Sequence, residues 1–403
     1  MARFSRILSL SKAPLNRGAF FLARKKNNPS DIWGAMIARL RLLILLIFIA
    51  LLTACTGPSN SPEASSSTAS AFQDIPTPRP YRLISGELQL AASPDDIPAI
   101  FASDALFVSA QEGSAEWLDQ EPIIGVLIEE EARAYPIRLL SLHEIVNDHV
   151  GGKSIAVTWC PLCYTAIVFD RVVADRELTF GVSGYLFHNN LVMYDHQTET
   201  LWSQALGQAI RGAYSRTQLD FIGSQLSTWG AWKQAHPTTL VLSAQQMGRQ
   251  ATEILDPYAG YYRSGMAGLG GQASLDDRLP PKALVLGIRV GAEQRAYPFD
   301  TIRNVALIND ELATSPILVL YNPELNTAAA FSRTIDGKIL TFHINIEGQL
   351  VDQETGSQWS METGQALTGP LKGTRLQRLA APLIFWFAWS DIYPQTGIFL
   401  SDG

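Results

Sequence analysis

Two cysteines, Cys160 and Cys163, are the residues in this sequence best suited to chemistry, and they stand three positions apart in a Trp-Cys-Pro-Leu-Cys run. Two thiolates at this spacing, joined by an imidazole, suit a soft or borderline metal ion such as Cu(I) or Zn(II). His143 or His188 could complete such a set, and the thioether of Met193 is a softer alternative. A copper or zinc site is therefore one hypothesis for this pair.

Two other interpretations of the cysteine pair stay open. A pair of thiols can exchange with disulfides, but the thioredoxin fold requires a long helix after the motif. Residues 165–170 read instead as a strand, so redox chemistry would have to take place on another fold. The third interpretation is a structural disulfide in a surface binding or scaffold protein without catalysis. The residues do not decide whether the protein is an enzyme.

Other candidate residues flank the motif. Glu144 follows His143 directly, and residues 181–190 read as a loop rich in glycine, aromatic residues and asparagine. This loop could line a site or contact a carbohydrate or peptide. Its candidate side chains are Ser183, Tyr185, Asn189 and Asn190.

An internal repeat shows which of these features are specific to one part of the chain. Residues 125–180 match residues 287–342 at a constant shift of 162, and residues 195–237 match residues 352–394 at a shift of 157. We therefore expect a tandem duplication with pseudo-two-fold symmetry. The first repeat unit covers residues 81–250 and carries the cysteines, and the second, degenerate unit covers residues 251–403.

The second unit lacks every candidate of the first. Asn322 and Leu325 stand at the positions of the two cysteines, and Val305 and Ala306 stand at those of His143 and Glu144. The second unit is also five residues shorter where the 181–190 loop falls. The site is therefore expected in the first unit, whereas shared Tyr-Pro and Asn-Asp pairs are attributed to turn and cap chemistry.

The elements that must position these residues are mostly strands. Alternating and β-branched apolar patterns predict an α+β fold with mostly antiparallel strands and short helices. In the first unit we expect helices at residues 139–147 and 229–235. The predicted strands are residues 123–128, 132–137, 154–159, 165–170, 178–182 and 191–194.

Several of these motifs together resemble a known family. The segments Glu131–Pro136, His143–Asp148, Cys160–Cys163, Gly181–Asp195 and Leu201–Gln204 are similar to the prokaryotic domain of unknown function 3179. The resemblance covers nearly all of the chain after the signal. It implies an exported or membrane-anchored protein and supports His143 and Cys160 as a signature pair, but it implies no activity.

The N-terminus predicts export and lipidation. Residues 1–41 contain nine Lys or Arg and one acidic residue, and residues 42–52 are almost purely apolar, which is the layout of a secretory signal. The run ends in Leu-Thr-Ala-Cys, which resembles a bacterial lipobox with Cys55 as the lipidated residue. We expect residues 1–54 to be a signal region, with Met36 as an alternative start. Residues 55–80 should form a flexible tether, rich in Ser, Pro, Ala and Thr, behind the lipid (palmitate) anchor.

Charge and compartment limit the partners. The first 54 residues hold nine of the 31 basic residues but one of the 38 acidic ones, so the net charge of the remaining chain is about −15. Such a surface repels nucleic acid, which we exclude as a partner. The expected partner is a membrane, reached through the lipid anchor. Thr56, where an inner-membrane protein would carry Asp, favours the outer membrane or cell surface, and any protein or small-molecule partner stays unidentified.

Overall fold

The structure is a computed structural model that describes residues 87–271, 273 and 276–400. The signal region of residues 1–54 with Met36, the lipidated Cys55 and the tether of residues 55–80 lie outside the described residues. The described chain is rich in short strands, mostly antiparallel, with a few short helices, so the predicted α+β class is confirmed. None of the helices between residues 87 and 400 is long and apolar enough to cross a membrane.

The first sheet is built around the hairpin of β4 (Pro122–Ile128) and β5 (Glu131–Pro136). Ile128 pairs with Glu131, so the acidic turn between them takes two residues, and Glu129 has a φ of 52°. The strands pair in the order β16 (Ser224–Thr228), β4, β5, β17 (Leu240–Leu242) and β3 (Phe107–Ser109). β17 runs parallel to β5, and the other neighbours are antiparallel.

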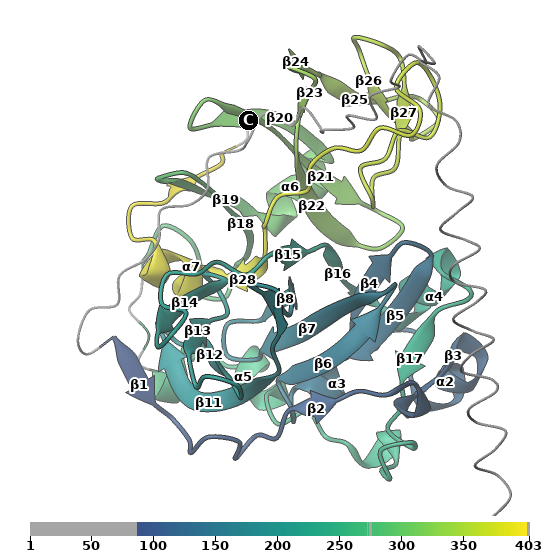
Figure 1. Ribbon diagram of the computed structural model, residues 1–403. Coiled ribbons are helices and arrows are strands. Elements are labelled where there is room, and N and C mark those ends of the chain that lie inside the picture. The colour runs from purple at the N-terminus through teal and green to yellow at the C-terminus, as the bar shows by residue number, and fades with distance from the viewer. Residues whose placement is uncertain (1–86, 272, 274–275, 401–403) are drawn as a thin grey trace, which may run out of the picture. The chain divides into compact units, whose positions relative to one another are not determined.

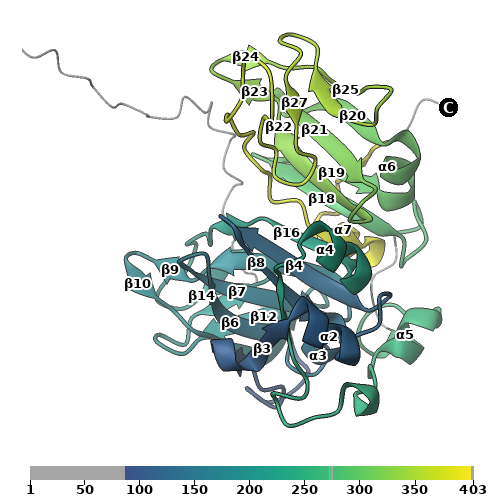
Figure 2. The same cartoon turned by 90° about the vertical axis from the view of Figure 1, so that its right-hand side faces the viewer.

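Helix α4 (Trp229–Ala235) has the predicted range and lies beside β4 and β16 (Figure 2). Its first turn is capped because the Thr228 hydroxyl accepts the N–H of Ala231. Trp232 packs directly on Gly125, where an added Cβ would lie 2.4 Å from the indole ring. Gly125 is therefore required for this close approach of helix and sheet.

The second sheet shows that the predicted helix at residues 139–147 is wrong. Helix α3 (Ile137–Leu140) makes a single turn, and β6 (Ile145–Val150) begins soon after it. Glu144 has a φ of 57°, which a continuing helix cannot adopt, and the β-branched pair that follows joins a sheet. The strands pair in the order β15 (Phe221–Ile222), β8 (Thr165–Asp170), β7 (Lys153–Cys160), β6 and β2 (Ile100–Phe101).

The third sheet shows that the loop expected at residues 181–190 is mostly a strand. Most of this segment forms β11 (Phe180–Phe187), and its pairing with β12 (Asn190–Asp195) shifts register between Val182 and Leu186. The glycines that suggested a loop lie in this strand, Gly184 with a φ of 75°, and only residues 188–189 form the turn. The strands pair in the order β1 (Leu88–Leu90), β11, β12, β13 (Leu201–Ser203) and β14 (Gln208–Arg211).

The strands after residue 280, drawn in green to yellow in Figure 1, pair in a similar pattern. One sheet has the order β28 (Leu383–Phe385), β18 (Leu284–Val290), β19 (Glu293–Pro298) and β29 (Gly397–Ile398), with β29 parallel to β19. The others are β20 (Leu307–Leu312), β21 (Ser315–Asn322) and β22 (Thr327–Ser332), and β25 (Phe342–Ile344), β26 (Leu350–Asp352) and β27 (Gln358–Trp359). Helix α6 (Phe299–Val305) follows β19, and α7 (Trp386–Ile392) follows β28.

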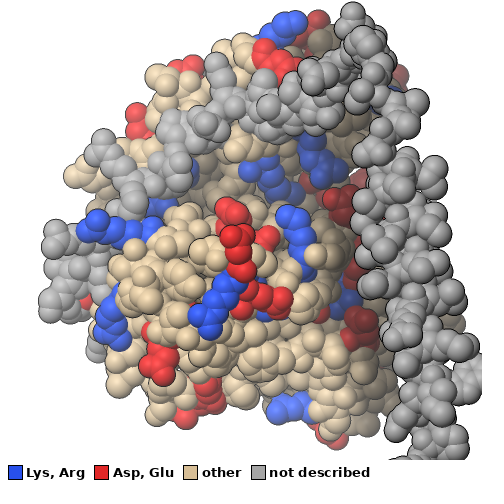
Figure 3. Space-filling model, viewed as in Figure 1, with Lys and Arg blue, Asp and Glu red and all other residues tan. Residues whose placement is uncertain are grey.

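Small elements complete the described chain. Two-stranded ribbons follow β8 and β22, and the segment between α4 and β18 is largely irregular. These elements are β9 (Val172–Val173), β10 (Arg176–Glu177), β23 (Thr334–Ile335), β24 (Lys338–Ile339), α2 (Ala110–Glu116), α5 (Ala259–Arg263), η1 (Asp104–Leu106), η2 (Ala251–Glu253) and η3 (Leu269–Gly271). On the face shown in Figure 3, acidic and basic side chains are interspersed among uncharged ones.

We call residues 87–250 the first half and residues 251–400 the second half. In the first half the buried carboxylate of Asp148 accepts hydrogen bonds from Arg133 and, at 2.6 Å, from the hydroxyl of Tyr135. The expectation of turn and cap chemistry is therefore wrong for the two Asn-Asp pairs, which lie within β6 and β20, whereas Pro136 and Pro298 of the Tyr-Pro pairs are the N-cap residues of α3 and α6. The second half has the same contacts among Arg295, Tyr297 and Asp310.

Candidate functional site

The two cysteines lie at the turn that joins β7 to β8. Cys160 is the last residue of β7, and the turn ends at Tyr164, which has a φ of 56°. The second half makes a similar turn, in which Asn322 Oδ1 accepts the N–H groups of the second and third residues after it, and Asn326 has a φ of 48°. The turn conformation therefore belongs to the fold, whereas the two sulfur atoms are specific to the first half.

Cys160 is buried and reduced. Its thiol donates to the carbonyl oxygen of Asn189 at 3.8 Å and is in hydrogen-bond contact with the thiol of Cys163. Neither cysteine forms a disulfide. Burial raises the pKa of the Cys160 thiol, and the neighbouring Cys163 and Glu144 raise it further. The thiol form of Cys160 is therefore the stable one unless a base or a metal ion removes its proton.

Cys163 lies in a more polar environment. Its Sγ accepts hydrogen bonds from the side-chain amide of Asn190 at 3.0 Å and from the hydroxyl of Thr165 at 3.3 Å. The same hydroxyl also lies 3.2 Å from the carbonyl oxygen of Cys163. Asn190 thus lies at the site as expected, because it begins β12 directly after the turn that follows β11.

A buried polar chain extends from Cys163. The amide of Asn190 also donates to Gln204 Oε1, and Gln204 Nε2 donates to the hydroxyl of Thr158 at 3.0 Å. All three polar side chains are fully buried. At the matching positions of the second half stand Leu320 for Thr158 and Met361 for Gln204. The network is therefore an addition to the first half and not a requirement of the turn.

Glu144 brings a carboxyl group to the same site. It lies between α3 and β6, and burial raises its pKa to about 8. Its charge acts on Cys160 and on Tyr258, and raises the pKa of both. The backbone φ of 57° is found again at Ala306 in the second half, with a φ of 63°. The strained backbone is therefore common to both halves, and the carboxyl group is specific to one.

His143 has a hydrogen-bond partner among the described residues on only one of its two ring nitrogens. Its Nδ1 lies 2.7 Å from the carbonyl oxygen of Pro98, which can only accept, so Nδ1 carries the proton. Burial lowers the pKa of His143, and its Nε2 is buried without a hydrogen-bond partner among the described residues. Within residues 87–400 as described, no group of three or more His, Cys, Asp or Glu is placed to hold a metal ion.

The remaining predicted residues have other contacts. His188 lies 3.3 Å from Asp391 and 3.7 Å from Glu87; burial alone would lower its pKa, but these two carboxylates raise it. Met193 is buried in the same apolar cluster as the cysteines. Ser183 donates to the carbonyl oxygen of Val192, and Tyr185 lies under the guanidinium of Arg211.

Sequence reasoning missed three tyrosines that cover the cysteines. They lie in or beside α5, in the segment between the two matched stretches, so the internal repeat gave no signal for them. The Tyr261 hydroxyl donates to the carbonyl oxygen of Leu162 at 2.9 Å, and Tyr262 packs against Tyr164. Burial raises the pKa of Tyr261 to about 12, and the two cysteines contribute to that rise. A cluster of tyrosines near Tyr258 was the only sequence signal.

Comparison with known proteins gives a family but no close relative. The family described as "Protein of unknown function (DUF3179)" matches residues 94–396. That range holds every site residue described above. No curated protein and no solved structure matches the chain.

Proposed function

This chain belongs to the DUF3179 family, and on that premise we propose that it is an exported, lipid-anchored protein whose function is thiol–disulfide exchange at Cys160 and Cys163. One observation carries the proposal. The two thiols are neighbours in a buried site that also holds Glu144, and none of these three groups has a counterpart in the second half. The lipidation at Cys55 and the signal before it rest on the sequence alone.

The proposal includes a tandem duplication with pseudo-two-fold symmetry, with units at residues 81–250 and 251–403. The contacts that recur in the two halves support it. Beside the Asp148 and Asp310 networks, Trp232 and Trp389 each donate at 2.9 Å to a threonine seven residues later. The second unit, on this view, preserves the fold and supplies packing, since Phe385 N–H donates to the carbonyl oxygen of Cys163.

The exchange reaction uses only groups that are present and a disulfide co-substrate. One protein sulfur attacks the co-substrate disulfide and releases one thiol; the second protein sulfur then attacks the mixed disulfide and releases the other thiol. The protein dithiol loses two electrons and two protons, and both pairs end on the two released thiols. Because burial disfavours the Cys160 thiolate, the step needs a base, and Glu144 with a pKa of about 8 is suited to accept that proton.

A second candidate is binding of a single Cu(I) ion. Two adjacent thiolates are soft ligands that suit Cu(I), and the described residues supply no third His, Cys, Asp or Glu to the pair. Zinc fits less well, because its protein sites use three or four such ligands. The predicted set of Cys160, Cys163, His143, His188 and Met193 is therefore reduced here to the two cysteines.

Mass spectrometry and thiol counting test the proposal on the full chain purified in detergent. We expect a chain that begins at a lipid-modified Cys55. We also expect glutathione disulfide to remove two reactive thiols, and dithiothreitol to restore them. Retention of residues 1–54 would contradict the anchor. Thiols that stay reduced with glutathione disulfide while the protein holds one Cu(I) would favour the metal ion. A disulfide that dithiothreitol cannot reduce in the folded protein would favour a structural role.

Two variants test whether the residues around the cysteines set the rate of exchange or whether any buried cysteine pair would react equally fast. Glu144→Gln keeps the shape but removes the base, so we expect slower oxidation and loss of its rise with pH towards pH 8. The second variant moves the pair to the other half, with Cys160→Ser and Cys163→Ser combined with Asn322→Cys and Leu325→Cys. Since that half lacks Glu144, Asn190 and Gln204, we expect slower exchange there. Equal rates in the two halves would refute a specific role for the first-half site.

A further inference from the structure

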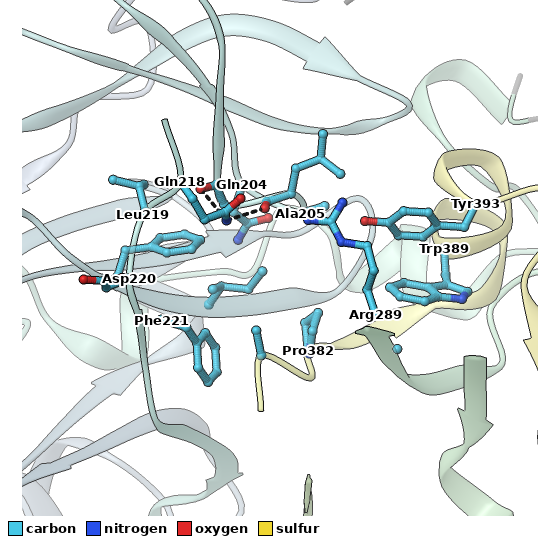
Figure 4. Close-up of a pocket in the computed structure, with 16 residues that line it drawn as sticks. Gln204, Ala205, Gln218, Leu219, Asp220, Phe221, Arg289, Pro382, Trp389 and Tyr393 are labelled. Atoms are coloured by element: carbon cyan, nitrogen blue, oxygen red, sulfur yellow. Dashed lines mark hydrogen bonds between the residues drawn. The ribbon is translucent and has the colours of Figure 1, made fainter. Parts of the chain in front are cut away.

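A pocket of about 160 Å³ opens between segments of the two halves (Figure 4). Its walls are largely apolar: Phe169 and Phe221 come from the first half, and Pro382 and Trp389 from the second. Trp389 lies directly on Gly287, where an added Cβ would be 2.3 Å from the ring, so this wall is fixed by packing. The pocket does not include the cysteines, although Gln204 lines it and is hydrogen-bonded to Asn190, which contacts Cys163.

A second pocket, of about 190 Å³, is lined by residues at the matching sequence positions. Arg378 stands there at the position of Phe221, and Leu127 stands at the position of Arg289. The guanidinium of Arg378 already has partners within the protein. It donates to the carbonyl oxygens of Ser224 and Glu362, and the negative charge of the Glu362 carboxylate lies near it. The molecule thus offers an internal reference for the first pocket.

Arg289 in the first pocket has no such compensation. It is half-buried and lies over the ring of Tyr393 at 5.8 Å, with a hydrogen bond to that residue's side chain. No carboxylate of the described residues forms an ion pair with it, and the position of Glu362 is occupied by Ala205. Asp220 lines the same pocket but lies at the opposite side from Arg289 in Figure 4. A guanidinium has five donors, so several stay available to a ligand.

We infer that this pocket binds a small organic carboxylate with a compact apolar body. An apolar cavity of about 150 Å³ holds one benzene ring, so a cavity of this size takes a ligand near the size of benzoate. The guanidinium of Arg289 would bind the carboxylate in its planar, two-pronged geometry, and the aromatic walls would hold the ring. This site goes beyond the proposed thiol chemistry and does not depend on it.

Calorimetric titration of benzoate into the full chain in detergent tests this inference. We expect saturable binding of one benzoate for each chain. Benzyl alcohol, which lacks the charge, and acetate, which lacks the ring, should each bind more weakly by about tenfold or more. Absence of saturable benzoate binding, or equal binding of benzoate and benzyl alcohol, would overturn the inference.

Matched variants locate the site. Arg289→Leu introduces the residue found at the matching position and should weaken benzoate binding by about tenfold or more. Arg375→Leu removes one positive charge from the second pocket and should leave binding unchanged, as should Cys160→Ser. If Arg289→Leu fails to fold, Arg289→Gln takes its place. Loss of binding in Arg375→Leu, or full binding in a folded Arg289 variant, would refute the assignment.

Discussion

The two halves share several backbone features but bury different side chains. Both have an arginine, a tyrosine and an aspartate in one network, a tryptophan packed on a glycine, and a turn that ends in a left-handed residue. Only the first half has Thr158, Gln204 and the two cysteines at the end of this framework, where the second half has Leu320, Met361, Asn322 and Leu325. The comparison teaches that the fold tolerates polar groups at one end of its sheets, where a network satisfies them.

The largest expected effect concerns the pH dependence of stability through Glu144. Its folded-state pKa of about 8 lies above the ordinary value of 4.5, so the native state holds a proton that the unfolded chain loses. The contribution of Glu144 to the free energy of unfolding should therefore be highest below pH 4.5 and fall as pH rises to 8, by up to about 5 kcal/mol. Urea unfolding of the protein between pH 4 and pH 8 measures this change in the free energy of unfolding.

Glu144→Gln supplies the control for this titration. The amide stays neutral, so the variant should lose the part of the decline that Glu144 causes and gain stability relative to the wild type as pH rises. The second half carries Ala306 at this position and cannot contribute. Parallel curves for the two proteins would show that the carboxyl group is not buried in the way described.

A smaller difference should separate the two shared networks. Asp148→Ala leaves Arg133 buried without its main partner, and we expect it to lower the free energy of unfolding by about 3–5 kcal/mol. Asp310→Ala should cost about 1–2 kcal/mol, because the side chain of Arg295 is 29% exposed and water can replace the carboxylate. Chemical denaturation of both variants measures the two losses in the free energy of unfolding. Equal losses would show that the two networks do not differ in burial as inferred.

The smallest expected effect is at the helix caps. α4 begins with a hydrogen bond from Ala231 N–H to the Thr228 hydroxyl, whereas the N-cap residue of α7 is Phe385, which makes no such side-chain cap. Thr228→Ala should lower the free energy of unfolding by about 1 kcal/mol, and Thr228→Ser, which keeps the oxygen, should lower it less. A similar loss in both variants would mean that the methyl group, and not the cap, matters.

Local sequence pattern predicted the regular elements well where strands are continuous. The ranges of β8 and α4 are as expected, because alternating burial and a short helix ended before a proline leave clear signals. The prediction of a helix at residues 139–147 was wrong, since the apolar spacing of these residues also fits one helical turn followed by a strand. The prediction of a loop at residues 181–190 was wrong because glycines occur both in turns and in strands that contain a bulge.

The candidate site was predicted only in part. The cysteine pair, Glu144 and Asn190 come together as the internal repeat suggested. Among the described residues His143 forms no group of three metal-binding side chains with the cysteines. Its Nδ1 contact with the carbonyl oxygen of Pro98 is one that sequence spacing does not reveal. Tyr261 comes from the connecting segment, which has no partner in the repeat. Contacts between distant segments are set by tertiary packing, and a single sequence carries little signal for them.

The segment around α5 joins the two halves and also lies over the thiols, which gives it a kinetic role. Cys160 is buried beside this segment, so a reagent reaches it only after a local opening, and the observed modification rate is the intrinsic rate multiplied by the equilibrium constant for that opening. α5 itself buries none of its residues fully, so that opening should cost less than global unfolding. Thiol-modification rates therefore become a measure of the local stability of the connection between the halves.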